Sequence, residues 1–262
     1  MILQLINSVG KTVLEACTSV GRFVLFFLHC ISVVFTSRPN MRQILQQIER
    51  VGVGSFAIIF LTGASSGLAL ALQTYIGLSR FGGEEFLGLV VALGMTRELG
   101  PVLTGLMVTG RAGSAMAAEL GTMQISEQID ALRTLQVNPY QYLVIPRILA
   151  TTFILPFLAT ISMLCGIAGG FFYCVYVLQM SPDMYLSSIK SHVELSDITG
   201  GLFKSSVFGL ILSWVGSYNG FYTTGGARGV GISTTRAVVV GSIMILIANY
   251  ILSALLFKTG LS

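Results

Sequence analysis

Charged side chains are scarce in this sequence. Only 10% of its 262 residues are Asp, Glu, Lys or Arg, whereas 53% are hydrophobic. A soluble domain usually carries about 25% charged residues, because its surface must be hydrated. The shortage excludes an ordinary soluble domain and indicates that much of the surface faces lipid. The net charge of +4 is spread along the chain, unlike the clustered basic patch of a nucleic-acid-binding protein.

The sequence also lacks the residue groupings that carry catalysis or bind metals. The cysteines form no CxxC pair and the two histidines lie far apart (Cys17, Cys30, Cys165, Cys174; His29, His192). No nucleophile, base and orienting acid stand in a recognisable set. The segment Gly10-Lys11-Thr12 resembles the end of a phosphate-binding loop, but Leu5 stands where that loop needs its first glycine. We therefore expect no enzyme active site, no metal and no ATP site in this chain.

Long charge-free runs are what the sequence has instead. A helix needs about 20 apolar residues to cross the hydrocarbon core of a membrane. Four runs meet this length: 51–79, 148–182, 205–227 and 237–257. A fifth, from Phe86 to about Gly110, is apolar on both sides of Arg97 and Glu98. These runs predict an all-α integral membrane protein with about five transmembrane helices, organised as a single domain over 1–262 with its bundle at 51–262.

The first 50 residues differ from the rest. The apolar run from Phe23 to Phe35 has only 13 residues, which is short for a span. Apolar residues recur at helical spacing before it (Ile2, Leu5, Ile6, Val9, Val13, Cys17, Val20). We expect residues 1–50 to form an N-terminal segment with a helix at the membrane interface. A re-entrant segment or a sixth span at 23–35 remains an alternative.

The distribution of cations predicts the orientation. With five spans and a cytoplasmic N-terminus, ten cations fall on the cytoplasmic side (Lys11, Arg22, Arg38, Arg42, Arg50, Arg111, Arg133, Arg147, Arg228, Arg236). Three fall on the other side (Arg80, Lys190, Lys258). Loops rich in Lys and Arg stay in the cytoplasm, so the C-terminus is expected outside.

Pairs of glycines four residues apart recur in the apolar runs (Gly63 and Gly67, Gly166 and Gly170, Gly216 and Gly220). This spacing lets two helix backbones approach closely within lipid. It predicts a tightly packed bundle or dimer, without indicating a function.

Three charged residues are expected inside the membrane: Arg97, Glu98 and Lys204. A charge at the bilayer centre costs roughly 2.5–3.5 kcal/mol on insertion scales, so such residues usually line a pathway. Neighbours on a helix diverge by about 100°, so Arg97 and Glu98 cannot face the same partner. We expect Glu98 to meet Lys204 and Arg97 to point into a polar cavity or at a lipid headgroup. The alternative is an ion pair that only locks two helices together.

The loop between Arg111 and Arg147 is predicted to hold a short amphipathic helix. Ser126 is a candidate N-cap, and Asn138-Pro139 would end the helix. Three apolar residues share one face (Ile129, Leu132, Leu135). That face could pack on the lipid interface, on the protein's own bundle, or on a cytoplasmic partner; spacing alone leaves these open.

Several motifs resemble the MlaE/YrbE permease family. They are Arg97-Glu98 followed by Leu99-Gly100-Pro101-Val102-Leu103; Gly110-Arg111-Ala112-Gly113-Ser114-Ala115; Ala118-Glu119-Leu120-Gly121; Glu127-Gln128-Ile129-Asp130-Ala131-Leu132; Val137-Asn138-Pro139; Ile145-Pro146-Arg147; and Thr234-Thr235-Arg236. The resemblance runs from about Val51 to the C-terminus. Asn138 departs from the family, which often has an acidic residue there.

The resemblance implies a homodimeric permease of an ABC transporter in the bacterial inner membrane. It would move phospholipid between the inner and outer membranes. ATP and Mg²⁺ would be used by a separate MlaF-type ATPase, with an MlaB-type STAS protein bound to that ATPase and an MlaD-type MCE protein on the periplasmic face. The N-terminal helix would be an elbow beside the bundle.

The resemblance also assigns residues. Arg97, Glu98 and Lys204 would lie near the lipid cavity. Residues 119–137 would be the coupling helix region that contacts the ATPase, with the candidate contact residues Glu119, Glu127, Gln128, Asp130, Leu132 and Arg133.

Two other functions fit the same residues. In an ion- or proton-coupled secondary carrier, Glu98 and Lys204 would relay protons, and transport would follow a gradient without an ATPase. In a purely structural membrane protein, the three charges could be replaced without loss of transport.

Overall fold

The computed structural model describes residues 2–36 and 40–259; for residues 2–10, 12, 13, 15, 16, 35 and 259 it describes the backbone only. Throughout these described residues the regular structure is helical, with no strand. Six helical segments are long and apolar enough to cross a membrane, judged by length and composition. The prediction of an all-α integral membrane protein is confirmed.

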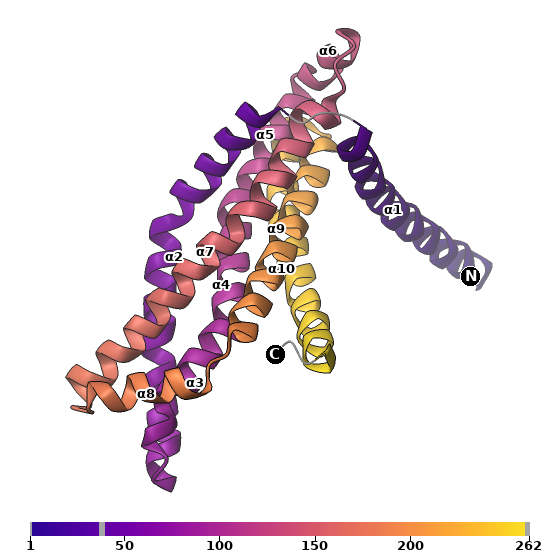
Figure 1. The fold of residues 1–262 in the computed structure, drawn as a ribbon. Coiled ribbons are helices and arrows are strands. Elements are labelled where there is room, and N and C mark those ends of the chain that lie inside the picture. The colour runs from indigo at the N-terminus through magenta and orange to yellow at the C-terminus, as the bar shows by residue number, and fades with distance from the viewer. Residues whose placement is uncertain (1, 37–39, 260–262) are drawn as a thin grey trace.

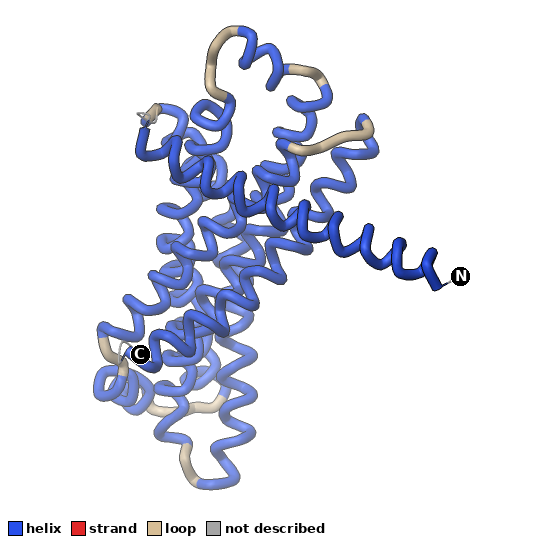
Figure 2. The backbone as a smooth tube through the Cα atoms, turned by 90° about the vertical axis from the view of Figure 1, so that its right-hand side faces the viewer, coloured by secondary structure: helices blue, strands red, loops and turns tan. Residues whose placement is uncertain are grey.

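Helix α1 (Ile2–Thr36) is one continuous helix that leaves the bundle at an oblique angle, as both Figures 1 and 2 show. Its stretch Cys17–Val34 is the sixth candidate span, the alternative that the sequence left open. Most of the side chains that give residues 2–20 their amphipathic pattern lie outside the described residues. The second half of α1 does contact the bundle: Phe23 stacks on Trp214, with ring centroids 4.1 Å apart.

The other five candidate spans form the elongated bundle of Figure 1. They are α2 (Met41–Leu78), the rod Glu84–Ile125, the segment Tyr140–Val177, α9 (Leu195–Phe221) and α10 (Gly226–Thr259). The rod comprises η2 (Glu84–Phe86), α3 (Leu87–Leu93), η3 (Gly94–Leu99), α4 (Gly100–Val108), η4 (Thr109–Gly113) and α5 (Ser114–Ile125); Tyr140–Val177 comprises η5 (Tyr140–Val144), α7 (Ile145–Phe172) and η6 (Tyr173–Val177).

Short elements mark the two ends of the bundle. The 3-10 turn η1 (Ser79–Phe81) and helix α8 (Pro182–His192) lie at one end, and α6 (Gln128–Thr134) lies at the other (Figure 1). We call these the α8 end and the α6 end. The C-terminal end of α10 points towards the α8 end, whereas α2 begins at the α6 end.

Close backbone approach holds α2 against α7, as the glycine pairs predict. A Cβ on Gly67 would lie within 1.9 Å of the Gly166 carbonyl oxygen, and one on Gly63 within 2.8 Å of the Ser162 carbonyl oxygen. Either would force the helices apart, so only glycine permits this packing. The tightly packed bundle predicted from the glycines is confirmed.

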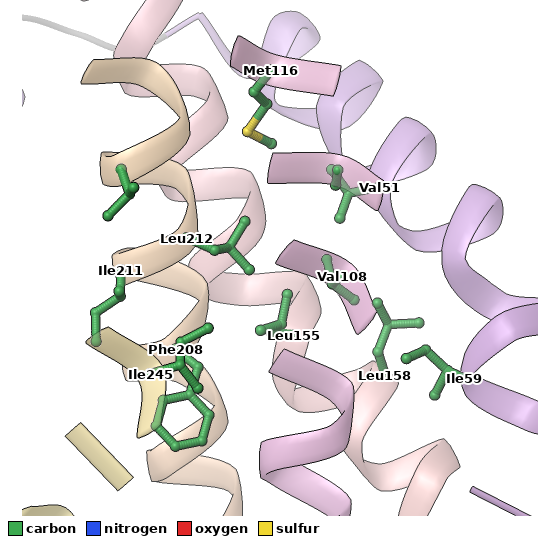
Figure 3. Packing of buried hydrophobic residues seen from close by; sticks show 12 residues of the cluster. Val51, Ile59, Val108, Met116, Leu155, Leu158, Phe208, Ile211, Leu212 and Ile245 are labelled. Atoms are coloured by element: carbon green, nitrogen blue, oxygen red, sulfur yellow. The ribbon is translucent and has the colours of Figure 1, made fainter. Parts of the chain in front are cut away.

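The main apolar core lies at the centre of the bundle (Figure 3). Leu155, Phe208, Leu212 and Ile245 are among its buried residues and come from α7, α9 and α10. Side chains from α2, α4, η4 and α5 complete the cluster. The apolar centre separates two groups of charged residues, one nearer each end.

The structure corrects the predicted start of α6. Ser126 is not its N-cap: it ends α5, and its hydroxyl donates to the Thr122 carbonyl oxygen at 2.8 Å. Glu127 occupies the N-cap with φ of 59°, which reverses the chain direction sharply. The helix ends at Thr134, before the predicted stop at Asn138-Pro139, because Gln136 also adopts a positive φ of 58°. Local sequence favoured Ser126 as a cap, but two left-handed residues decide the bounds.

Candidate functional site

Two charged residues of α9 face the same way. Asp197 and Lys204 are seven residues apart, which is almost two full turns and places them on one face of the helix. Opposite them, Arg97 and Glu98 are neighbours in the π-helical segment η3. Such wide turns are frequent at functional sites. These four residues form what we call the α8-side cluster.

Arg97 pairs with Asp197. The Arg97 Nε and Nη2 atoms lie 2.6 and 2.5 Å from Asp197 Oδ1, so the carboxylate takes both donors. Its other oxygen, Oδ2, accepts from the Glu194 backbone N–H at 3.0 Å in a capping box that begins α9. Asp197 was not predicted as a site residue. The spacing of Glu194 and Asp197 before an apolar run was the available signal.

Glu98 pairs with Lys204, as predicted. Lys204 Nζ lies 2.8 Å from Glu98 Oε1, and it donates at the same distance to the Arg97 carbonyl oxygen and to Ser253 Oγ. All three donors of the ammonium group are therefore satisfied. Asn249 donates to Glu98 Oε2, and Ser253 donates to Oε1. Asn249 and Ser253 were not predicted as site residues; their spacing of four in a charge-free run was the available signal.

The α8-side cluster borders a cavity of about 240 Å³. Its lining consists of Arg97, Glu98, Asp197, Gly200, Gly201, Lys204, Ser253, Leu256 and Phe257. Within each ion pair one member is half-buried, with 39% of the Arg97 side chain and 43% of the Glu98 side chain exposed. The other members, Asp197 and Lys204, are 1% and 4% exposed. Arg97 borders this cavity while paired with Asp197, and the cavity is lined by two cations and two anions.

A second set of charges lies nearer the α6 end. Glu119 on α5 receives Arg50 of α2 at 2.8 Å and Arg147 of α7 at 3.0 Å. Arg111 in η4 donates to Ser55 Oγ of α2 at 3.0 Å. We call Arg50, Arg111, Glu119 and Arg147 the α6-side cluster.

The candidate coupling residues divide into two groups. Glu119 belongs to the α6-side cluster and links three helices, so it faces the bundle. The others are Glu127, Gln128, Asp130, Leu132 and Arg133, which lie on α6 or at its N-cap. Asp130 and Arg133 form an exposed ion pair at 2.7 Å.

Helix α6 is anchored to the bundle by Ile129. That side chain is fully buried among Leu120, Leu143 and Phe221, whereas Leu135 is 72% exposed. The predicted apolar face is therefore split, with one residue seated on the protein's own bundle and another left uncovered.

Comparison with known proteins identifies the family. The sequence model of the family described as Permease MlaE matches residues 44–255. A protein of Rickettsia felis named "Probable ABC transporter permease protein" is 44% identical over 258 residues, covering 98% of this chain and 100% of that protein. The Haemophilus influenzae "Intermembrane phospholipid transport system permease protein MlaE" is 34% identical over 267 residues, covering 99% and 100%.

A plant protein is also similar to this chain. The Arabidopsis thaliana "Protein TRIGALACTOSYLDIACYLGLYCEROL 1, chloroplastic" is 40% identical over 225 residues, which is 86% of this chain and 64% of that protein. The family match covers all five bundle segments and both charge clusters. This chain is a multi-pass membrane protein and belongs to the MlaE family of ABC transporter permeases.

Proposed function

We propose that this permease moves phospholipids between the inner and outer membranes of a bacterium. The observation that carries the proposal is the cavity beside the α8-side cluster, which offers one cation and one anion to a ligand. The family relative from Haemophilus influenzae, whose name specifies phospholipid transport, supports the same cargo.

The chemistry of the cavity suits a phospholipid headgroup. A guanidinium binds phosphate through two parallel hydrogen bonds, and Arg97 is held at the cavity by Asp197. The Glu98 carboxylate would accept a hydrogen bond from the ammonium group of a zwitterionic headgroup. Leu256 and Phe257 add an apolar edge on which an acyl chain can lie.

Buried partners keep both charges in place. Moving them towards lipid would leave Asp197 and Lys204 unpaired inside the bundle, which is costly. Arg97 and Glu98 are therefore preorganised, and a headgroup that enters the cavity meets charges that already point correctly.

Energy would come from partner subunits. We propose a homodimer that binds two copies of an MlaF-type ATPase, which hold ATP and Mg²⁺, with an MlaB-type STAS protein and an MlaD-type MCE protein as further partners. The cation bias supports a cytoplasmic α6 end and a periplasmic C-terminus in the inner membrane.

Helix α6 would be the coupling element. The exposed residues Glu127, Gln128, Asp130 and Arg133 are available to an ATPase, and Leu135 is uncovered. Because Ile129 seats α6 on the ends of the spans, force applied to α6 would pass into α5 and α9. Rigid helices then transmit the movement to the cavity.

A proton-coupled carrier built on Glu98 and Lys204 is the alternative. Membership of an ABC permease family favours ATP-driven transport instead. The two differ in a simple measurement: a carrier keeps transporting when its ATPase is removed and stops when the proton gradient is collapsed.

The test is to purify the detergent-solubilised chain from its native membrane and identify bound proteins and lipids by mass spectrometry. We expect an ATPase, an MCE-domain protein and bound phospholipid. The Asp197→Asn variant should retain the protein partners and lose roughly tenfold in bound phospholipid, because Arg97 is no longer held at the cavity and a charge-assisted hydrogen bond contributes roughly 1.5–3 kcal/mol. A wild-type chain that purifies without ATPase and without lipid would contradict the proposal.

A further inference from the structure

The α6-side cluster has an excess of positive charge. Three guanidinium groups, those of Arg50, Arg111 and Arg147, belong to the cluster with one carboxylate, that of Glu119, which pairs with Arg50 and Arg147 only. Among the described residues Arg111 has no carboxylate within 4 Å: its donors reach Ser55 Oγ and the Arg50 carbonyl oxygen. The cluster is therefore an incomplete ion-pair network that still lacks negative charge.

A cavity of about 240 Å³ opens where Arg50, Arg111 and Glu119 meet. Gly54 forms the surface on which the Arg111 guanidinium rests, because a Cβ there would fall within 1.9 Å of Arg111 Nη2. Roughly 300–1,000 Å³ is typical of pockets that enclose a whole small molecule. The smaller volume here suits a headgroup whose remainder lies outside the protein.

The charges lie at the boundary between polar and apolar sequence. Arg50 directly precedes the charge-free run 51–79, and Arg147 directly precedes the run 148–182. Arg111 follows the apolar run that ends near Gly110. Since each helix leaves the hydrocarbon region at these residues, the cavity stands at the depth of the lipid headgroups.

An apolar path continues from the cavity into the membrane region. Ala57 and Leu61 follow Arg50 at helical spacings of seven and eleven residues, so they lie on nearly the same stripe of α2, and Ile58 lies beside this stripe. All three are exposed in the chain and are available to an acyl chain. An acyl chain can lie along this stripe while its phosphate reaches the arginines.

We propose that this cavity binds the phosphate of an anionic phospholipid from the membrane leaflet on the α6 side. The proposal concerns a second site, separate from the α8-side cavity, and it does not depend on which way lipid is transported. Arg50 and Arg111 would bind the phosphate directly. Glu119 and the buried Arg147 would hold Arg50 in position.

Membrane orientation alone does not explain the arrangement. The rule that places cations in the cytoplasm requires only that Lys and Arg be present in the loops. It does not require a glycine under a guanidinium, a cavity between two arginines, or an apolar stripe below them. An anionic phospholipid would use all three features: its phosphate would bind the arginines in the cavity, and its acyl chain would lie on the apolar stripe.

The experiment is native mass spectrometry of the full-length chain in detergent, titrated with phosphatidylglycerol or with phosphatidylcholine. We expect phosphatidylglycerol to bind more tightly. Each basic side chain near an anionic lipid contributes roughly fivefold. The double variant Arg50→Gln, Arg111→Gln should therefore lose about 25-fold in phosphatidylglycerol affinity and little in phosphatidylcholine affinity.

Two further variants separate the site from general charge. Arg42→Gln, Arg228→Gln removes the same charge from residues that do not line the cavity, and it should bind phosphatidylglycerol as the wild type does. Gly54→Ala keeps every charge but displaces the Arg111 head, so it should weaken binding severalfold. Thermal unfolding of each variant checks that it is folded.

A photoreactive group on the acyl chain of phosphatidylglycerol tests the position. It should label the α2 peptide that contains Ile58 and Leu61. Equal affinity for the two lipids, equal loss in both double variants, or labelling elsewhere would overturn the proposal. Competition by millimolar inorganic phosphate with no α2 labelling would also overturn it, because the ligand would then be free phosphate.

Discussion

The two charge clusters of this permease differ in balance. The α8-side cluster has two cations and two anions in two closed ion pairs, and its Lys204 ammonium group has all three hydrogen-bond donors satisfied. The α6-side cluster has three arginines around one glutamate. Both place an arginine in a π-helical segment, Arg97 in η3 and Arg111 in η4. Each cluster thus has one arginine in a wide turn beside its cavity.

The difference in balance follows from depth. Lys204 and Asp197 are nearly inaccessible, and an unpaired charge there would carry a large desolvation cost. At the α6 end, Arg50 is 64% exposed and can remain solvated or contact headgroups. Charges deep in the bundle must therefore match, whereas charges at the boundary can exceed their partners and attract a ligand.

The largest effect is expected from Lys204→Met, which keeps the side-chain volume but leaves Glu98 without its cation. Losing a hydrogen bond to a charged group costs roughly 1.5–3 kcal/mol, and we expect lipid transfer by the reconstituted transporter to fall about tenfold or more. Lys190→Met on the exposed surface of α8 is the matched control. Normal lipid transfer by a folded Lys204→Met protein would show that the Glu98–Lys204 ion pair only holds two helices together.

A smaller effect is expected from Gly67→Ala, in the contact between α2 and α7. Gly67→Ala places a methyl group against the Gly166 carbonyl and should lower the free energy of unfolding by about 1–3 kcal/mol. Gly77→Ala lies on the same helix with no atom within 4 Å of the new Cβ, and it should be neutral or stabilising. Thermal unfolding in detergent measures both. If the two variants unfold alike, close backbone contact is not what holds α2 to α7.

Glu119→Gln tests the unbalanced cluster directly. Glu119 is the only carboxylate among the described residues that Arg147 contacts. Its loss should cost about 1 kcal/mol of unfolding free energy, since Glu119 itself is partly exposed. It should also tighten phosphatidylglycerol binding, because the positive excess grows. Glu85→Gln, at an exposed position near the α8 end, serves as the control. Weaker binding in Glu119→Gln would show that the positioning of Arg50 outweighs the gain in charge.

The smallest effect is expected from Tyr185→Phe at the α8 end. The Tyr185 hydroxyl donates to the Ile167 carbonyl oxygen at 3.1 Å, and losing this bond should cost about 1 kcal/mol at neutral pH. Burial raises the pKa of the Tyr185 hydroxyl above its ordinary value, so the folded state favours the neutral phenol. Stability from this effect is complete below about pH 10 and declines as pH rises further.

Unfolding of wild type and Tyr185→Phe should therefore be compared at neutral pH and above pH 10. The wild type should be more stable than Tyr185→Phe at neutral pH, and this difference in unfolding free energy should shrink at the higher pH. Tyr176→Phe, at an exposed tyrosine, controls for loss of a hydroxyl elsewhere. A wild-type advantage that persists unchanged at high pH would contradict the assignment to Tyr185 ionisation.

Much of the membrane architecture followed from local patterns. Charge-free runs predicted the five spans of the bundle, and paired glycines predicted its close packing, because both depend on the length and size of nearby residues. The contact between Glu98 and Lys204 was also predictable, since few intramembrane charges were available to pair. Ser126 was predicted wrongly, because the direction of the chain after α5 is set by where α6 docks.

The sequence by itself determined that this protein is a membrane protein, which five runs are long and apolar enough to cross a membrane, and which family it resembles. Only the tertiary structure decided that Asp197 holds Arg97, that Asn249 and Ser253 complete the Glu98 site, and that Gly54 supports Arg111. The physical reason is distance along the chain. Spans depend on neighbours within a few turns. These contacts join residues about 50 to 150 positions apart, which only the packing of helices brings together.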